Sequence, residues 1–144
     1  MKNVAIACDR AGRKLRDFIV GSRGEFSQFN FIDLGTNSDS PVDYPDYARL
    51  VVEKILSGDA DFGVLICGTG VGMSMAANRF KGIRAGLCHN GLESRLVREH
   101  NDANILCLGA RIIGEECALE NLRVFLNTPF EGGRHALRIQ KLDL

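Results

Sequence analysis

The sequence predicts one α/β domain over residues 1–144, with a five-stranded, mostly parallel, doubly wound sheet and helices on both faces. A chain of 144 residues fits one domain and leaves little room for a second. Short apolar runs alternate with segments of helical spacing along its whole length. No internal repeat, low-complexity tract or linker interrupts this alternation. Strands that alternate with helices favour a parallel sheet with right-handed crossovers.

The predicted strands are almost wholly apolar, as expected of strands that are buried on both faces of a parallel sheet. They cover residues 4–8, 29–34, 62–67, 83–88 and 105–108. The run 62–67 is the most strand-like in the chain. Residues 21–30 are hard to assign, because no clear period extends through them.

Helical spacing marks the segments between the strands. Leu15, Phe18 and Ile19 recur on one helix face until Gly21. Pro45 stands in a loop rich in turn formers, where the first turn of the next helix would tolerate it. The predicted helices cover residues 15–21, 47–56, 73–79, 93–100, 115–126 and 134–144.

Composition excludes several classes of protein. Hydrophobic residues make up 45% and charged residues 25%, the balance of an ordinary globular protein. Eighteen basic residues match eighteen acidic ones, so no net field favours nucleic acid or an anionic membrane. The first apolar stretch ends after five residues, too short for a signal peptide or membrane span. Five scattered cysteines lack CxxC or zinc spacing, so we expect a reduced, cytoplasmic protein.

The segment after the third predicted strand reads Cys67-Gly68-Thr69-Gly70-Val71-Gly72. Ligands of open α/β sheets bind outside the carboxyl ends of the strands, which is where this segment would lie. Its three glycines let backbone N–H groups approach and hold an oxyanion. A helix N-terminus beside Cys67 would favour its thiolate, which makes it a candidate base or nucleophile. The alternative, equally compatible with the pattern, is that Cys67 merely ends a buried strand.

Nucleotide-binding patterns do not fit this loop. Met73 occupies the place of the third glycine in the dinucleotide fingerprint. The next strand ends in Cys88-His89, without an acid that could bind a ribose. A Walker Gly-Lys-Ser/Thr sequence is also missing. The loop therefore suits a small oxyanion better than a nucleotide.

Among the three histidines, His100 has the strongest claim to a role. It lies in the polar sequence Glu99-His100-Asn101-Asp102 between a predicted helix and strand, where it could transfer a proton near pH 7. The alternative is a surface histidine whose charge suits a helix C-terminus, and unaided the sequence favours that alternative. His89 and His135 have weaker claims.

Arginines offer candidate anion sites. Arg134 and Arg138 are four residues apart, so they share a helix face and could bind one phosphate, although most such pairs lie on a solvated surface. Arg111 follows a strand end, and Asp9-Arg10 places an acceptor beside a cation at another.

Five sequence motifs together cover nearly the whole chain: Ala7-Cys8-Asp9, Asp43-Tyr44-Pro45, Ile66-Cys67-Gly68-Thr69-Gly70-Val71-Gly72, Glu99-His100-Asn101-Asp102 and Phe130-Glu131-Gly132-Gly133-Arg134-His135. In this order they resemble the type B ribose-5-phosphate isomerase family, whose relatives include the galactose-6-phosphate isomerase subunits. The resemblance implies a Rossmann-like sheet in a homodimer or tetramer, with active sites at the subunit interface and neither metal nor cofactor.

The resemblance also assigns roles to residues. It implies Cys67 as the base that removes a proton next to the sugar carbonyl, His100 as the group that opens the furanose ring, and Thr69 as a third catalytic residue. The backbone of Gly68, Gly70, Val71 and Gly72 would hold the enediolate. Asp9 and Asn101 would bind sugar hydroxyls, and the anion-binding arginines would be Arg111, Arg134 and Arg138, the last two reaching into the partner's site.

One departure from the family concerns Arg10, which stands where the family usually has histidine. Arginine keeps a cation for phosphate, but it is longer, so the accepted sugar length could differ. The Cys67-Gly68-Thr69-Gly70 loop favours a pentose, because the galactose-type subunits tend to lack it. Isomerisation of ribose 5-phosphate and ribulose 5-phosphate is therefore expected. The alternatives are an isomerase of allose 6-phosphate or another hexose 6-phosphate, and a sugar-phosphate-binding module without turnover.

Overall fold

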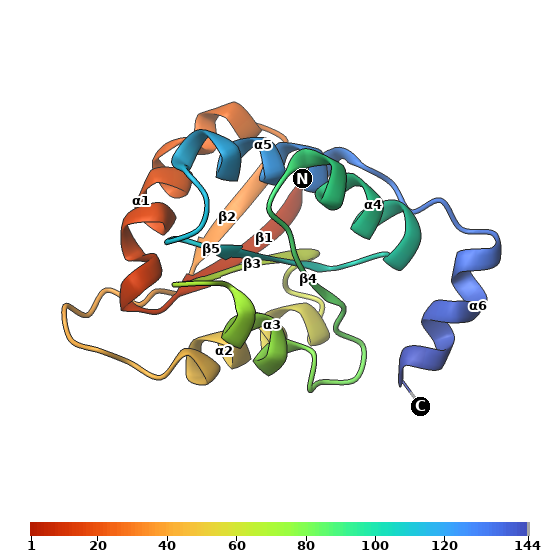
Figure 1. Cartoon of the computed structure of the whole chain (residues 1–144), viewed down its shortest axis with the longest axis horizontal. Coiled ribbons are helices and arrows are strands. Elements are labelled where there is room, and N and C mark those ends of the chain that lie inside the picture. Colours follow the sequence, from red (N-terminus) through yellow and green to blue (C-terminus); the bar gives the residue numbers. More distant parts are fainter. Residues whose placement is uncertain (144) are drawn as a thin grey trace.

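A five-stranded sheet forms the centre of the structure, a computed structural model that describes residues 1–143 (Figure 1). The strand order is β2-β1-β3-β5-β4, and every neighbouring pair is parallel. The strands are β1 (Lys2–Cys8), β2 (Phe29–Asp33), β3 (Phe62–Cys67), β4 (Ala85–Leu87) and β5 (Ile105–Gly109). The predicted α/β fold is confirmed, and the sheet is entirely parallel.

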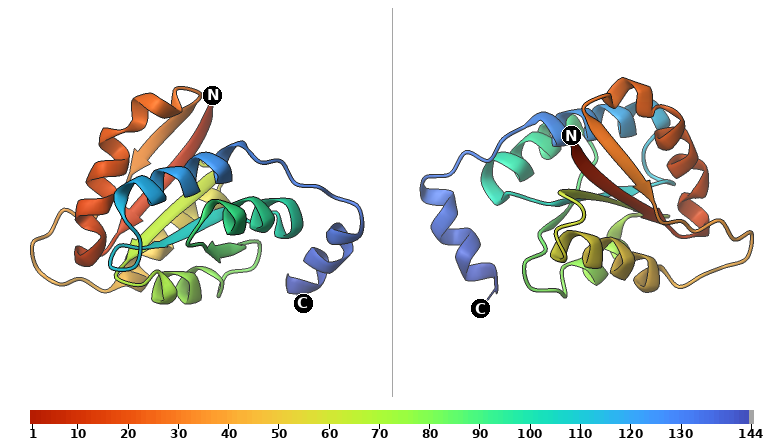
Figure 2. Two further views of the ribbon diagram at one scale, coloured as in Figure 1. Left: turned by 45° about the horizontal axis from the view of Figure 1, so that its top comes forward. Right: turned by 180° about the vertical axis from the view of Figure 1, so that it is seen from behind.

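Helices cover both faces of this sheet (Figures 1 and 2). One face carries α1 (Arg13–Gly21), α4 (Gly91–Asn101) and α5 (Glu115–Asn127), and the other carries α2 (Tyr44–Leu56) and α3 (Val71–Ala77). The last helix, α6 (Arg134–Gln140), stands apart from both layers at one side of the molecule. Within residues 1–143, no helix combines the length and the hydropathy that crossing a membrane requires.

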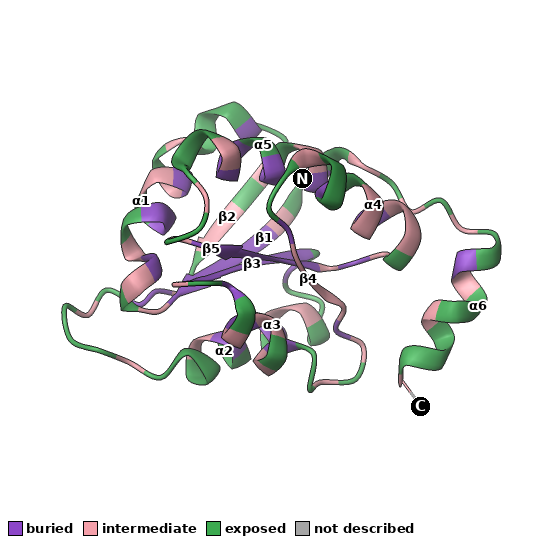
Figure 3. Ribbon diagram, viewed as in Figure 1, coloured by how far each residue is buried: buried purple, intermediate pink, exposed green. Residues whose placement is uncertain are grey.

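Burial on both faces explains the apolar strand runs. Alternate residues of β1 enter different cores: Val4 and Ile6 pack under α1 and α5, whereas Ala5 and Ala7 face α2 and α3. Every residue of β3 and β5 is buried (Figure 3). The small alanines on one face allow α2 to approach the sheet closely.

Several ends of strands and helices differ from the predictions. One reason is that a buried apolar residue need not belong to a paired strand. Ile83 and Cys88 are buried, yet β4 covers only residues 85–87 because it pairs with β5 alone. Helix α2 begins at Tyr44, three residues earlier than predicted, with Pro45 in its first turn. The hard-to-assign segment contains a short 3₁₀ helix, Arg23–Phe26. The last predicted helix gives way to a 3₁₀ turn at Lys141–Asp143, and its residue 144 lies outside the described residues.

The chain changes direction across the sheet between β1 and β3. From β1 it passes through α1 to β2 on one side, and then through α2 to β3 on the other. Such a switch point leaves a crevice at the carboxyl ends of the two strands, where ligands of this fold class bind. Cys8 and Cys67 are the last residues of these two strands.

A buried arginine fixes the loop that follows β2. The Arg16 side chain is only 1% exposed and forms ion pairs with Asp17 at 2.8 Å and Asp33 at 2.9 Å. Its Nη2 also donates to the Thr36 carbonyl at 2.9 Å and to Asn37 Oδ1 at 3.0 Å. These four acceptors compensate the charge for the loss of water, and they hold the loop against the end of β1.

Gly63→Ala tests how closely α2 and β3 approach. A Cβ at residue 63 would overlap Val51 Cγ1 and come within 3.1 Å of Ile55 and Ile105 side-chain carbons. We expect the free energy of unfolding to fall by about 1–3 kcal/mol, the usual cost of overpacking a core, in urea unfolding followed by circular dichroism. Gly24→Ala is the control, because nothing lies within 4 Å of the added carbon. Equal stabilities of the two variants would contradict this close packing.

Candidate active site

Cys67 is the last residue of β3, at the carboxyl edge of the sheet next to the switch point between β1 and β3. The residue is 5% exposed, and the backbone N–H of Gly70 donates to its Sγ at 3.2 Å. Asp9 N donates to the carbonyl of Ile66, so the turn after β1 lies directly beside the end of β3. The predicted thiol therefore lies at the carboxyl edge of the sheet, with a backbone donor directed at its sulfur.

The loop after Cys67 is pressed against the ends of β4 and β5, which accounts for its glycines. Gly70 has φ +79°, a conformation that side chains disfavour, and a Cβ there would lie 3.0 Å from the Leu108 carbonyl carbon. A Cβ on Gly109 would in turn come within 2.7 Å of the Thr69 carbonyl carbon. The exposed Thr69 keeps its Oγ1 near the loop backbone, where it accepts from the Val71 N–H at 3.2 Å.

Tyr44 covers the far end of this loop, a contact that sequence reasoning missed. A Cβ on Gly72 would lie 2.8 Å from the Tyr44 ring and 3.2 Å from its hydroxyl. Tyr44 is exposed at 38%, and its ring lies against the first turn of α3. The available signal was the Asp43-Tyr44-Pro45 motif, which carried the resemblance without receiving a role.

Two of the predicted arginines and the predicted aspartate lie at the same edge of the sheet. The carbons and Nε of the exposed Arg111 side chain pass 3.5–3.6 Å from the position of a Cβ on Gly68, and its backbone N–H donates to the Gly68 carbonyl. Asp9 Oδ1 accepts from the Gly12 N–H at 3.1 Å. Arg10 Nη1 donates to the Asp39 carbonyl at 3.4 Å, so this cation is held towards the loop after β2.

The remaining predicted residues lie at the opposite edge of the sheet. His100 and Asn101 end α4, four residues before the amino end of β5, whereas Cys67 pairs with Gly109 at the carboxyl end of β5. The five residues of β5 separate the two groups by about 13 Å along the strand direction. Arg134 and Arg138 do share a face of α6, as predicted, but α6 belongs to the His100 end.

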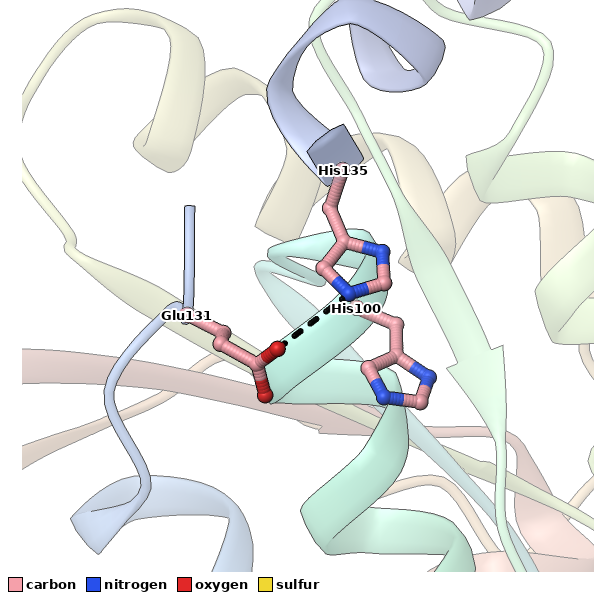
Figure 4. Close-up of side chains that lie close together, drawn as sticks. All are labelled: His100, Glu131 and His135. Atoms are coloured by element: carbon pink, nitrogen blue, oxygen red, sulfur yellow. Dashed lines mark ion pairs between the residues drawn. The ribbon is translucent and has the colours of Figure 1, made fainter. Parts of the chain in front are cut away.

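His100 has neighbours to which the sequence motifs gave no role. Its ring stacks on that of His135, and Glu131 lies beside His135 (Figure 4). Together these three residues offer metal-ligating atoms that lie within 4.8 Å of one another. They come from α4, α6 and the loop before α6.

Burial changes the acidity of three of the other cysteines. Loss of hydration raises the pKa of Cys8 to about 11 and that of Cys88 to about 11, and it also raises the pKa of the fully buried Cys107. These three thiols pack in the core and stay protonated at neutral pH. Cys117 is partly exposed, and its Sγ lies 3.2 Å from the His89 carbonyl.

The chain matches known proteins over almost its whole length. The model of the ribose/galactose isomerase family matches residues 4–142. The chain belongs to this family. It is similar to a putative sugar phosphate isomerase of Bacillus subtilis, at 49% identity over 97% of this chain and 94% of that relative. The family that the sequence motifs indicated is thus confirmed.

Solved structures of ribose/galactose isomerases share the fold. The crystal structure of a ribose 5-phosphate isomerase from Thermotoga maritima matches with a TM-score of 0.95 and 51% identity, over 99% of this chain and 97% of that one. Ribose-5-phosphate isomerase B from Mycoplasma genitalium, solved with bound ribulose-5-phosphate, matches with a TM-score of 0.90 and 44% identity, over 97% and 93%.

The raised pKa values predict which thiols react. At pH 8 a thiol of pKa about 11 is about one-thousandth thiolate, so iodoacetamide should modify Cys117 well before Cys8 or Cys88. Labelling of Cys8 should increase as the pH rises towards 11, because thiolate forms as the pH approaches the pKa. Peptide mass spectrometry measures each site in the folded protein. Equal labelling of Cys8 and Cys117 at pH 8 would contradict the burial described.

Proposed function

We propose that the chain is an aldose–ketose isomerase that interconverts ribose 5-phosphate and ribulose 5-phosphate through an enediolate. The observation that carries the proposal is the Cys67 thiol at the carboxyl edge of the sheet, next to the β1/β3 switch point, with the Gly70 amide directed at its sulfur. Membership of the ribose/galactose isomerase family supports it, as does the relative with bound ribulose-5-phosphate. The whole chain, residues 1–144, would form one isomerase domain of the pentose phosphate pathway.

The proposed reaction moves one carbon-bound proton and one hydroxyl proton. Cys67 as thiolate removes the proton from C2 of the open-chain aldose, and the electron pair of that bond forms the C1=C2 double bond of the enediolate. The negative charge moves to O1, where N–H groups of the loop 68–72 stabilise it. Thr69 transfers the O2 proton to O1, and Cys67 returns its proton to C1, which yields the ketose.

Charged side chains at the crevice suit the rest of a sugar phosphate. Arg10 and Arg111 place two exposed guanidinium groups at the carboxyl edge of the sheet, where they can bind phosphate oxygens. Asp9 is half-buried beside them and is suited to accept from sugar hydroxyls.

A second copy of the chain would complete the site. The ring-opening residue His100, the hydroxyl-binding Asn101 and two phosphate-binding arginines lie at the wrong edge of the sheet to act with Cys67 of the same chain. In a two-fold homodimer each chain can give its Cys67 edge to one site and its His100 edge to the other. Large apolar side chains are exposed at both edges, for example Val71 and Leu137. A tetramer would pair two such dimers.

The state of the cysteines bears on the compartment in which the protein works. All five cysteines are free, as suits a protein of the reducing cytoplasm.

A hexose phosphate such as allose 6-phosphate is the second candidate substrate. The observation that favours it is the contact of Arg10 with Asp39, because it draws the longer cation towards the loop after β2 and so enlarges the phosphate end of the crevice.

Turnover of ribose 5-phosphate and allose 6-phosphate by wild type and Cys67→Ala tests the reaction. We expect pentose turnover, with kcat reduced on the order of a thousandfold in Cys67→Ala because the base is lost, and with little change in affinity for a non-reacting phosphate analogue measured by calorimetry. Cys117→Ala is the matched control and should retain full activity. Near-normal turnover by Cys67→Ala would show that another group is the base, and preference for allose 6-phosphate would favour the second candidate.

Mixed dimers test whether sites are shared. Cys67→Ala and His100→Asn chains, unfolded together and refolded, should recover about a quarter of wild-type activity, because half of the dimers are mixed and each has one intact site. Each variant refolded alone provides the baseline, and sedimentation gives the oligomeric state. If the mixture stayed at the baseline, Cys67 and His100 would not act across an interface.

A further inference from the structure

One buried residue, His135, attaches α6 to the rest of the chain. It is 6% exposed, and it is the only buried residue of this helix within the described part of the chain. Its ring lies on the ring of His100, with centroids 4.5 Å apart and planes inclined by 16° (Figure 4). Arg134 and Arg138, on the same helix, are exposed. The stack therefore ties the first turn of α6 to the last turn of α4.

Glu131 lies at the edge of the His135 ring. Its Oε1 lies 3.5 Å from His135 Nε2, and its backbone N–H donates to the Glu99 carbonyl at 3.0 Å. The loop before α6 is thereby tied to the last turn of α4, next to His100. Within residues 1–143, His135 Nε2 is the one buried side-chain nitrogen or oxygen without a hydrogen-bond partner. The Glu131 carboxylate is the charged group beside it.

The geometry of the rings argues against a metal-binding role for this cluster. Imidazole nitrogens bind a metal through lone pairs that lie in the ring plane, and tetrahedral ligands must converge on one point. The two ring planes are nearly parallel, so their lone pairs do not converge, although the ligand atoms lie within 4.8 Å of one another. Stacking is the interaction that this arrangement favours.

We propose that His135 is a positioning residue that holds the His100 imidazole in the orientation needed for opening the sugar ring. The inference rests on the function proposed above, in which His100 transfers protons to open the furanose. A proton-transfer group must keep its nitrogen within hydrogen-bond reach of the ring oxygen. His100 is half-buried in the last turn of α4, and the stacked ring of His135 restricts how far the His100 ring can tilt out of its plane.

Two substrates separate ring opening from proton abstraction at carbon. Ribose 5-phosphate is mainly a furanose, closed through O4. Its 4-deoxy analogue lacks the hydroxyl that closes this ring, so it stays open. Both require Cys67, but only the first requires ring opening. The quantity to compare is the factor by which each variant lowers kcat/KM on each substrate.

We expect His135→Ala to lower kcat/KM for ribose 5-phosphate about tenfold or more beyond its effect on the 4-deoxy analogue. This factor is smaller than the full contribution of a proton-transfer group, because His135 acts only through His100. His135→Phe retains a flat ring for stacking and should restore most of the lost activity. In a His100→Asn background, His135→Ala should cause no further selective loss, because the group that it positions is already missing. Thermal melting and sedimentation control for folding and assembly, and His135→Leu gives the same comparison should His135→Ala unfold.

The outcomes distinguish this inference from the function on which it rests. If wild type turned over neither substrate, the proposed function would fail. If His100→Asn lowered activity on both substrates equally, the ring-opening role of His100 would fail. If His100→Asn showed the selective loss but His135→Ala lowered both substrates equally, or if His135→Phe were as impaired as His135→Ala, the positioning role of His135 would be overturned.

Discussion

The parallel direction of all five strands is the constraint on which the arrangement of this protein depends. Each strand ends at the same edge of the sheet, and each returning helix ends at the other. Cys67, at the end of β3, and His100, at the end of α4, are therefore placed at opposite edges by topology alone. Local rearrangement of side chains cannot bring them together, because the length of β5 lies between them.

The crevice at the carboxyl edge is built by close contact between backbones. A Cβ on Gly12 would lie 2.6 Å from the Ile66 carbonyl oxygen, so the turn after β1 rests directly on the end of β3. The loop from Gly68 to Gly72 rests in the same way on β4 and β5. The loop after β2 borders the crevice as well, and the Arg16 guanidinium holds this loop in place. Since these contacts involve backbone atoms, the donors around Cys67 are fixed before any ligand arrives.

Sequence reasoning predicted those features of the fold and the site that depend on the local sequence pattern. Strands buried on both faces produce continuous apolar runs, so β1, β3 and β5 were predicted within about two residues at each end. The glycine loop and Cys67 were found because the backbone conformation demands particular residue types. The family was recognised from motifs, each of which surrounds a strand end or a helix end, and the family model confirmed it.

What sequence reasoning missed depends on contacts between distant segments. Arg16 stands on an amphipathic helix where arginine normally faces water, and only the loop after β2 supplies its acceptors. Tyr44 meets Gly72 across 28 positions of the chain, and His135 meets His100 across 35. Hydrophobic periodicity carries no information on contacts between residues so far apart in the sequence. The extent of β4 was overestimated because burial, and not strand pairing, makes its flanking residues apolar.

The separation of the two edges has a genetic consequence if two chains share their sites as proposed. A chain that carries defects at both Cys67 and His100 would damage one site through its own thiol edge and the other through its histidine edge. Its dimer with a normal chain would then have no intact site at all. Such an allele would act as a dominant negative, because only the dimers of two normal chains, about a quarter of all dimers, would keep activity. An allele with either defect alone would leave one working site in every mixed pair.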